Sequence, residues 1–171
     1  MSEDEMCAAF ASELQHSQAF VEWLLDRTRF AGAASGARVL WEEQKRNRYS
    51  ASAPWWRHWF TSKCMCPGCL GGRETDIFAV FEATSKNRFA LHIENKMLKS
   101  SFTPGQAAAY GTRAKCWAKQ TRFLDYSESQ TVLLAPESFF SKNADAALFD
   151  IFISHENIAE RCPAFVTRVL D

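Results

Sequence analysis

The fold is decided by residues 76–96, which carry the sequence DIFAVFEATSKNRFALHIENK. Two apolar runs, 76–82 and 88–94, are rich in the β-branched and aromatic residues that favour strands. Between them, residues 84–87 (Thr-Ser-Lys-Asn) supply the small and polar side chains typical of a turn. The pattern therefore predicts a β-hairpin.

Three charged side chains at the open end of this hairpin predict a site for a divalent metal. A loop centred on Ser85 places Asp76 directly opposite Glu94, with their Cβ atoms roughly 5 Å apart. Lys96 shares their face, and because side chains alternate along a strand, the arrangement requires a loop with an odd number of residues. Two carboxylates this close repel each other unless a cation lies between them, and hard oxygen ligands suit Mg²⁺ or Mn²⁺. A structural salt bridge between Glu94 and Lys96 fits the same pattern, since so short a motif recurs by chance.

A third carboxylate is expected from an N-terminal helix. Apolar residues fall at helical spacing over residues 5–27, and Glu13 lies within the apolar face that they form. A carboxylate aimed at the core requires a metal, a cation or a hydrogen-bond donor. Glu13 is therefore either a metal ligand or half of a buried ion pair. Glu42, at the end of an expected first strand over residues 39–42, is the rival candidate.

Another helix is predicted after the hairpin, where residues 103–110 have the sequence TPGQAAAY. Pro104 suits the first helical position, and Thr103 can cap it. Gln106 and Tyr110 then lie one turn apart on the same helical face. Gln106 also stands where it can close a capping box with Thr103, which is a purely structural role.

In combination, these segments resemble the PD-(D/E)XK nuclease superfamily with a RecB-like QxxxY element. The matching features are Glu13 on an N-terminal helix, Gly72-Arg73-Glu74-Thr75-Asp76, Ile93-Glu94-Asn95-Lys96, and Gln106 followed by Tyr110. The combination is more specific than any single motif in it. The chain departs from the family in having Thr75 where the name-giving motif has proline, and in the long interval between the first helix and Asp76.

The resemblance covers roughly residues 10–135 and implies how the chain is organised. It implies an α/β fold with a restriction-endonuclease-like core of order α-β-β-β-α-β. We expect one domain over residues 1–171, with a Trp- and Cys-rich insertion at 45–72 before the catalytic hairpin and a C-terminal extension at 136–171.

The resemblance also implies a role for each matching residue. The residues implied to be catalytic are Glu13, Asp76, Glu94, Lys96, Gln106 and Tyr110. The three carboxylates and the backbone carbonyl of Asn95 would hold the metal, and the Gln–Tyr pair would position the nucleic-acid strand or the lysine. Lys96 would orient the attacking water or stabilise charge at the scissile phosphate.

Hydrolysis of a phosphodiester needs a nucleophile at neutral pH and neutralisation of developing charge, and a divalent ion supplies both. The expected function is therefore a Mg²⁺- or Mn²⁺-dependent nuclease acting on DNA, as an endonuclease. The alternative is a catalytically silent nucleic-acid-binding or scaffolding module that keeps the same fold and a structural zinc knuckle.

The charge distribution is compatible with a nucleic-acid substrate. The chain has no net charge, but residues 45–122 hold fourteen Lys and Arg against four Asp and Glu. Phosphate binding depends on such local positive potential. The candidate nucleic-acid contacts are Arg73, Lys99, Arg113 and Lys115. The acidic remainder of the chain can serve a protein partner, and paired cuts across a duplex would require a homodimer.

Tryptophans are concentrated in the insertion. Trp55, Trp56 and Trp59 are interleaved with Arg57 and His58, a mixture that can stack on unpaired bases while holding phosphates. The same tryptophans also suit a buried core or a dimer interface, and we favour burial because aromatic residues mostly serve packing.

Cysteines follow directly after the tryptophans. Cys66-Pro67-Gly68-Cys69 resembles a zinc knuckle, and Cys64 adds a third sulfur. His58 is the nearest candidate for the fourth ligand, with the chain's other cysteines behind it, namely Cys116, Cys162 and Cys7. Reduced cysteines, an iron–sulfur cluster and a redox disulfide remain open alternatives to zinc.

Composition permits this interpretation without requiring it. A chain of 171 residues with 47% hydrophobic content is long enough for one domain with a real core. No apolar stretch approaches the ~20 residues that span a bilayer. The acidic start Ser2-Glu3-Asp4-Glu5 does not resemble a secretion signal, so we expect a cytoplasmic protein.

Overall fold

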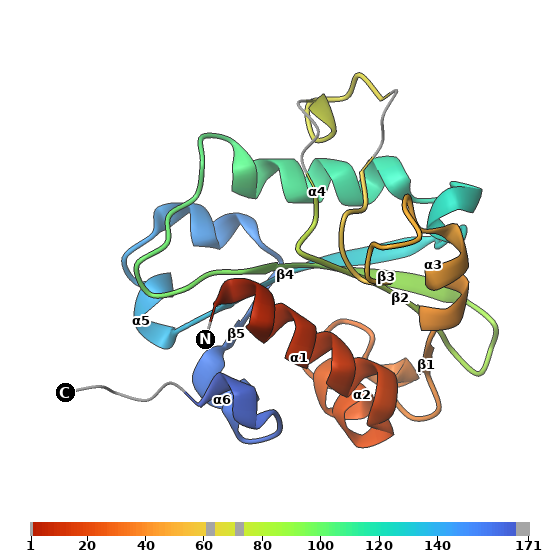
Figure 1. Ribbon diagram of the computed structural model, residues 1–171, viewed down its shortest axis with the longest axis horizontal. Helices are drawn as coiled ribbons and strands as arrows, with labels where there is room; N and C mark the ends of the chain where they lie inside the picture. The colour runs from red at the N-terminus through yellow and green to blue at the C-terminus, as the bar shows by residue number, and fades with distance from the viewer. Residues whose placement is uncertain (1, 61–63, 71–73, 167–171) are drawn as a thin grey trace.

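The computed structural model describes residues 2–60, 64–70 and 74–166, which form an α/β fold with helices on both faces of one mixed sheet (Figure 1). The strands follow one another across the sheet in chain order, namely β1 (Arg38–Val39), β2 (Ile77–Glu82), β3 (Arg88–Asn95), β4 (Glu128–Ala135) and β5 (Ile151–Ser154). The pairs β1–β2 and β2–β3 are antiparallel, whereas β3–β4 and β4–β5 are parallel.

The predicted hairpin is present as β2 and β3. Its register pairs Ile77 with Ile93 and Phe78 with His92, and its loop holds the five residues 83–87. The loop therefore has an odd number of residues, as the metal-site prediction requires. Continuing this register by one residue sets Asp76 opposite Glu94.

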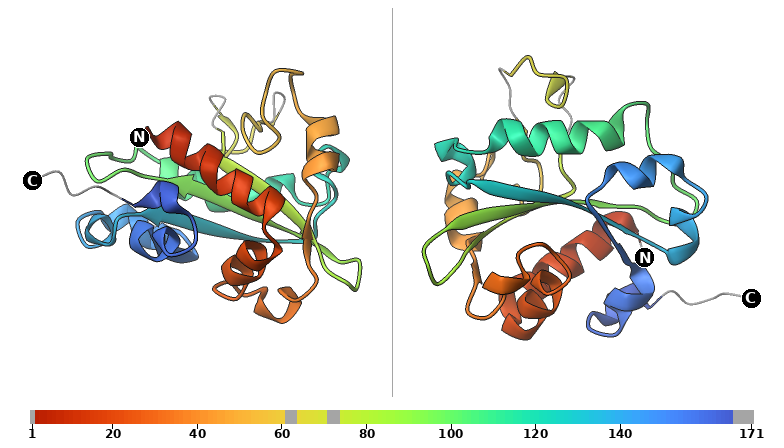
Figure 2. Two further views of the ribbon diagram at one scale, coloured as in Figure 1. Left: turned by 60° about the horizontal axis from the view of Figure 1, so that its bottom comes forward. Right: turned by 180° about the vertical axis from the view of Figure 1, so that it is seen from behind.

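Helices cover the two faces of the sheet unequally. The described residues contain α1 (Glu3–His16), α2 (Gln18–Leu25), α3 (Trp41–Asn47), α4 (Gln106–Trp117), α5 (Glu137–Phe140) and α6 (His155–Ala159). Short 3₁₀ turns add Ala31–Ala33, Thr121–Phe123, Ala144–Leu148 and Pro163–Phe165. Helices α1, α2 and α6 lie on one face and α4 on the other, which is clearest when the molecule is seen from behind (Figure 2). None of the helices in the described ranges has both the length and the apolar character needed to cross a bilayer.

The N-terminal segment forms two helices where one was predicted. Ser2 and Glu5 form a reciprocal capping box, so α1 begins at Glu3. Ser17 then ends α1 and caps α2, where its Oγ accepts a hydrogen bond from the Phe20 amide at 3.2 Å. The break turns the second helix so that both apolar faces meet the sheet.

The expected first strand over residues 39–42 is wrong beyond its first residue. Strand β1 ends at Val39 and the chain enters helix α3 at Trp41. The reason is Gln44, a buried residue of α3 whose side chain forms hydrogen bonds with the edge of β2. Its Nε2 donates to the Phe78 carbonyl and its Oε1 accepts from the Val80 amide, both at 2.9 Å. A side chain thus satisfies backbone groups that a longer strand would have paired.

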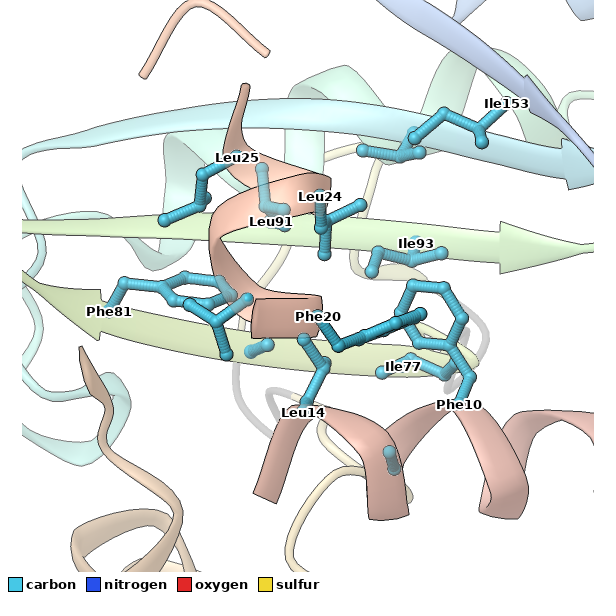
Figure 3. Close-up of a cluster of buried hydrophobic side chains, with 14 of the residues drawn as sticks. Phe10, Leu14, Phe20, Leu24, Leu25, Ile77, Phe81, Leu91, Ile93 and Ile153 are labelled. Atoms are coloured by element: carbon cyan, nitrogen blue, oxygen red, sulfur yellow. The ribbon is translucent and has the colours of Figure 1, made fainter. Parts of the chain in front are cut away.

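The main core lies between the sheet and helices α1 and α2. The core side chains labelled in Figure 3 come from α1, α2, β2, β3 and β5, and they are Phe10, Leu14, Phe20, Leu24, Leu25, Ile77, Phe81, Leu91, Ile93 and Ile153. The opposite face of the hairpin packs against α4 through a second cluster around Trp59, Phe78 and Trp117.

Burial of the insertion tryptophans is confirmed. The exposed fraction is 7% for Trp55, 8% for Trp56 and 1% for Trp59. The indole of Trp59 donates to the Trp55 carbonyl at 2.8 Å, and that of Trp55 donates to Gln15 Oε1 at 3.1 Å. These three rings are packing groups and are not a surface on which bases can stack.

The segment after residue 135 continues the same sheet. Strand β5 pairs in parallel with β4, through contacts such as Leu134 with Ile153. The following helix α6 buries Ile158 in the main core. This segment therefore contributes both a strand and core side chains.

Candidate active site

Asp76 and Glu94 lie side by side where β2 begins and β3 ends. Glu94 is fully buried, whereas Asp76 is partly exposed. The Asp76 Oδ2 atom accepts a hydrogen bond from the Asn95 amide at 3.0 Å, and the Asp76 amide donates to the Tyr110 hydroxyl at 3.2 Å. Both the backbone and the side chain of Asp76 are therefore fixed by neighbouring elements.

Three donors converge on the Glu94 carboxylate. Its Oε1 atom accepts from Gln106 Nε2 at 2.6 Å and lies 2.6 Å from Lys96 Nζ. Its Oε2 atom accepts from the Tyr110 hydroxyl in a short hydrogen bond. An ionised carboxylate offers about four lone-pair positions, so this arrangement leaves room for one further ligand on Glu94.

Lys96 is buried beside the carboxylates and stays charged. Its side chain is 9% exposed. Burial alone would lower the pKa of Lys96, but the carboxylates of Glu94, Asp76 and Glu3 outweigh burial and raise this pKa above its ordinary value. The ammonium therefore persists at neutral pH as a fixed positive charge.

Glu3, and not Glu13, is the α1 carboxylate whose charge acts on Asp76 and Lys96. Burial raises the pKa of Glu3, while the Lys96 ammonium lowers it and the Glu94 carboxylate raises it. Glu3 therefore interacts electrostatically with the site. Its carbonyl also accepts from Asn95 Nδ2 at 3.4 Å. Glu13 lies almost three turns further along α1, and its charge acts instead on the Cys162 thiol. The capping box of Ser2 and Glu5 signals that the helix starts at Glu3, but no local pattern signals that this side chain lies near the site.

The four charged groups carry an excess of negative charge. Burial and the nearby Glu94 carboxylate raise the pKa of Asp76 well above its ordinary value. When ionised, Glu3, Asp76 and Glu94 exceed the single ammonium of Lys96 by two charges, which is the charge of one divalent cation. An open cavity of about 200 Å³ lies beside Asp76 and Gln106, and it can admit several waters or a phosphate group.

Gln106 contacts both the chain before α4 and the Glu94 carboxylate. Its Oε1 atom accepts from the Thr103 amide at 3.0 Å, which is one half of the expected capping box, while its Nε2 donates to Glu94. Its role in positioning the nucleic-acid strand or the lysine stays a prediction. The predicted start of this helix is wrong by two residues. Gly105, at a φ of 73°, is the N-cap of α4, and Gln106 is the first helical residue. The positive φ at this point suits glycine, which has no Cβ to strain.

Two buried histidines contact neighbours of the site carboxylates, and both are neutral. His92 lies in the core, where its ring contacts Thr75 Oγ1 at 3.3 Å and the Tyr126 hydroxyl at 3.0 Å. Burial holds the pKa of His92 well below its ordinary value. His155 Nε2 lies 2.8 Å from Asn95 Oδ1, and burial lowers the pKa of His155 to about 4. The assignment of the Asn95 carbonyl as a metal ligand stays a prediction.

Of the candidate nucleic-acid contacts, Arg113 is not a surface cation. Its side chain is buried, with 1% exposed, and it donates to three protein acceptors. It also lines the cavity beside Asp76, so its contact with a phosphate there stays a prediction. Lys99 and Lys115 are exposed and remain available. Arg73 lies outside the residues that the structure describes.

Four cysteines form a second cluster of metal-ligating side chains, which we call the cysteine cluster. The sulfurs of Cys64, Cys66, Cys69 and Cys116 all lie within 4.8 Å of one another. The Cys66 amide donates to the Cys64 sulfur at 3.5 Å and helps lower the pKa of Cys64 to about 7.

His58 is not part of this cluster, so its assignment as the fourth ligand is wrong. Its Nδ1 atom lies 2.8 Å from Glu74 Oε2 instead. Cys116 takes the fourth position from helix α4, and Cys7 and Cys162 are buried in the main core. All six cysteines are free, with no disulfide among them. The helical spacing of Cys116 from Gln106, Tyr110 and Arg113 was the signal that could have identified it.

Comparison of the chain with protein-family models, with curated proteins and with solved structures gave no match. A functional assignment therefore depends on the side chains of the two clusters and on their geometry.

Proposed function

We propose that the protein is a metal-dependent nuclease that hydrolyses phosphodiester bonds in DNA. The observation that carries the proposal is the convergence of Asp76, Glu94 and Lys96 at one end of the sheet, with the Lys96 amine 2.6 Å from Glu94. The order α1–β1–β2–β3–α4–β4, with α2 and α3 added, supports it because it is the order implied by the resemblance to PD-(D/E)XK nucleases.

The donor set fits a hard divalent cation. Asp76, Glu94 and Glu3 offer carboxylate oxygens, which Mg²⁺ and Mn²⁺ prefer. Asp76 and Glu94 each retain lone pairs that their protein hydrogen bonds do not use. When bound there, a divalent ion would supply an activated water and neutralise charge on the phosphate. Asp76 and Glu94 would hold this ion.

Lys96 would act on the phosphate directly. An ammonium group has three donors, and the contact with Glu94 occupies one of them. The remaining donors are free to meet a phosphate oxygen or the attacking water, where a fixed positive charge stabilises the transition state. Gln106 and Tyr110 would act as positioning residues, because both hold the Glu94 carboxylate in one orientation.

Exposed lysines near the site support a nucleic-acid substrate, and we propose DNA. The exposed Lys99 follows the site lysine by three residues, and Lys115 projects from α4, so both can meet the phosphates of a strand near Asp76. Cleavage within a strand would make the protein an endonuclease. The alternative function, a silent nucleic-acid-binding or scaffolding module, would use the same surface without the chemistry.

Incubation with closed circular plasmid and with single-stranded DNA, in Mg²⁺, Mn²⁺ or EDTA, tests the proposal. Asp76→Asn should abolish cleavage, and Lys96→Ala should reduce it by roughly 100-fold or more. Lys86→Ala, which removes an exposed amine in the turn at the opposite end of the hairpin, is the matched control and should leave the rate almost unchanged.

Three outcomes would contradict the proposal. Equal cleavage by Asp76→Asn would identify a contaminant. Loss of Mn²⁺ binding in Lys96→Ala would show that the lysine maintains the metal site and does not act on the phosphate. Absence of cleavage under every condition, with DNA binding retained, would favour the silent module.

A further inference from the structure

Helix α4 connects the carboxylates to the cysteine cluster. Side chains three or four residues apart are neighbours on a helix surface, and Gln106, Tyr110, Arg113 and Cys116 follow one another along α4 at that spacing. The first two bind Glu94, and the last lies among the other cysteines. In Figures 1 and 2, residues 64–70 lie over α4 on the side away from the sheet.

The cysteine cluster has the dimensions of a site for one ion. In a tetrahedral zinc site with bonds of about 2.3 Å, neighbouring sulfurs are about 3.8 Å apart. The four sulfurs of this chain, all within 4.8 Å of one another, need only small shifts to reach that geometry. An iron–sulfur cluster distributes its cysteines over different iron atoms and therefore needs them further apart.

The loop has the backbone of a metal-binding knuckle. The amides of Cys69 and Leu70 both donate to the Cys66 carbonyl, at 3.0 and 3.1 Å, which closes a tight turn between two of the sulfurs. The Cys64 and Cys116 sulfurs approach to 3.2 Å across the junction between loop and helix. Four thiols facing one another make only weak hydrogen bonds, so a metal is the partner that would hold them together.

We propose that Cys64, Cys66, Cys69 and Cys116 form a structural zinc site that fastens residues 64–70 to helix α4 and thereby fixes the position of Asp76.

Arg113 transmits the position of the loop to the start of β2. Its guanidinium donates to the Gly68 carbonyl at 3.1 Å, to the Glu74 carbonyl at 2.9 Å and to Thr75 Oγ1 at 3.0 Å. One buried side chain thus joins the knuckle to the two residues that precede Asp76. Because its charge is buried, losing any one of these acceptors is costly, which makes the link stiff.

Close contact between the loop and α4 supports the same link. A Cβ atom added at Gly68 would lie 2.7 Å from the Arg113 amide nitrogen and 2.9 Å from the Ala109 carbonyl oxygen. The loop therefore packs directly on the helix backbone. If the loop moved away, Arg113 would lose its contact with Gly68 and the contacts with residues 74 and 75 would have to rearrange.

Metal analysis of the full chain, purified without chelator, tests the site itself. We expect about one equivalent of zinc and no iron. Cys116→Ser and Cys64→Ser should each lower zinc content at least roughly ten-fold. His58→Ala and Cys162→Ser are the controls and should retain it. Less than about half an equivalent in the wild type, iron in place of zinc, or full zinc content in Cys116→Ser would overturn the proposal.

Hydrogen exchange at the Asp76 amide tests the link, because this N–H donates to Tyr110 and reports the position of β2. Removal of zinc should accelerate exchange at Asp76 and leave Leu91, in the middle of β3, protected. Restoring zinc should restore protection. Unchanged exchange at Asp76 after zinc removal would overturn the link.

Arg113→Lys separates the two parts of the proposal. Lysine keeps the charge but cannot form three fixed hydrogen bonds, so zinc should remain bound while exchange at Asp76 accelerates. Thr75→Val, which removes a single acceptor, should act in the same direction by less and serves where Arg113→Lys does not fold. Normal Asp76 protection in both variants would show that Arg113 does not carry the link.

The placement of Asp76 for catalysis rests on the proposed nuclease function, but zinc content and amide exchange do not. A zinc-free wild type that cleaves DNA would overturn the zinc site and leave the nuclease proposal intact. A zinc-loaded chain with a protected Asp76 amide and no cleavage would overturn the nuclease proposal alone.

Discussion

The two clusters that flank helix α4 are held together in opposite ways. The carboxylates of Asp76 and Glu94 receive donors from the protein itself, namely Lys96, Gln106, Tyr110 and the Asn95 amide. The sulfurs of the cysteine cluster face mainly one another. Polar groups that already have hydrogen-bond partners in the protein need no metal to stay in place, whereas four thiols that make only weak hydrogen bonds need one to hold them together. The first region should therefore be formed before any metal arrives, and the second should depend on its metal.

Burial reinforces this contrast. Glu94 and Tyr110 are fully buried, and the hydrogen bond between them needs no metal. Cys64, Cys66 and Cys116 are only partly buried, although Cys69 is covered. A chelator should remove metal from the cysteine cluster while leaving the hydrogen bonds of the carboxylates unchanged.

The largest effect is expected from Glu94→Ala, measured by urea unfolding in EDTA. The substitution leaves the buried ammonium of Lys96 without its partner, and breaking a buried pair in this way costs about 3–5 kcal/mol of unfolding free energy. The matched control is Glu128→Gln, which breaks the exposed pair with Arg29 and should cost less than about 0.5 kcal/mol. Equal losses in the two variants would mean that the protein does not depend on the Glu94 network.

Asp76→Asn should have a smaller effect of opposite sign. Burial and Glu94 raise the pKa of Asp76 well above 3.8. Between 3.8 and that raised pKa the folded chain keeps a proton that the unfolded chain releases. The unfolding free energy therefore falls as pH rises through this window.

Without divalent ions, the Asn variant should lack this decline and melt at a higher temperature than the wild type near neutral pH. Added Mg²⁺ should stabilise the wild type alone, because ligand binding favours the folded state. Thermal melts from about pH 4 to about pH 8, with and without Mg²⁺, measure both effects. A variant less stable than the wild type in EDTA would show that the two carboxylates do not repel each other.

Tyr110→Phe sharpens the comparison by removing one hydroxyl that serves two partners. The hydroxyl donates to Glu94 and accepts from the Asp76 amide. Loss of these hydrogen bonds should lower the unfolding free energy by about 1–3 kcal/mol and accelerate exchange at Asp76, with zinc content unchanged. Loss of zinc in this variant would show that the two clusters are not separable.

The smallest effect is expected from Glu13→Gln. Its carboxylate does not reach Asp76 or Glu94, so stability should change by less than about 0.5 kcal/mol and Mn²⁺ affinity should stay the same. Glu3→Gln, on the same helix, should weaken Mn²⁺ binding measured by titration calorimetry. The reverse result would restore Glu13 as the third carboxylate.

Local rules explain which parts of the site could be predicted. The pairing of Asp76 with Glu94 followed from two apolar runs and the length of one turn, because strand register is a local property. Gln106 and Tyr110 followed from helical spacing. The capping box of Ser2 and Glu5 fixes where the first helix begins, but which of its carboxylates lies near Lys96 depends on how the helix packs on the sheet.

Other features depend on contacts between distant segments. Cys116 joins a loop that ends 46 residues earlier, at Leu70, and the sequence offered two more cysteines and His58 as rivals. Helix α3 replaced an expected strand because the Gln44 side chain pairs with the backbone of β2. The sequence suggested that Arg113 is a surface cation, but in the folded chain it is buried and joins Gly68 to residues 74 and 75. In each case the deciding partner lies far away in the chain.

The tight packing of the loop on α4 limits which substitutions the protein can tolerate at Gly68. Any larger residue would press a carbon atom against two backbone atoms of the helix, and backbone cannot rotate away as a side chain can. In a saturation library selected for zinc retention, this position should return glycine almost exclusively, although it supplies no ligand. Its neighbours Pro67 and Leu70 should accept substitutions far more readily. The selected variants would therefore retain this glycine as strictly as they retain the cysteines of the loop.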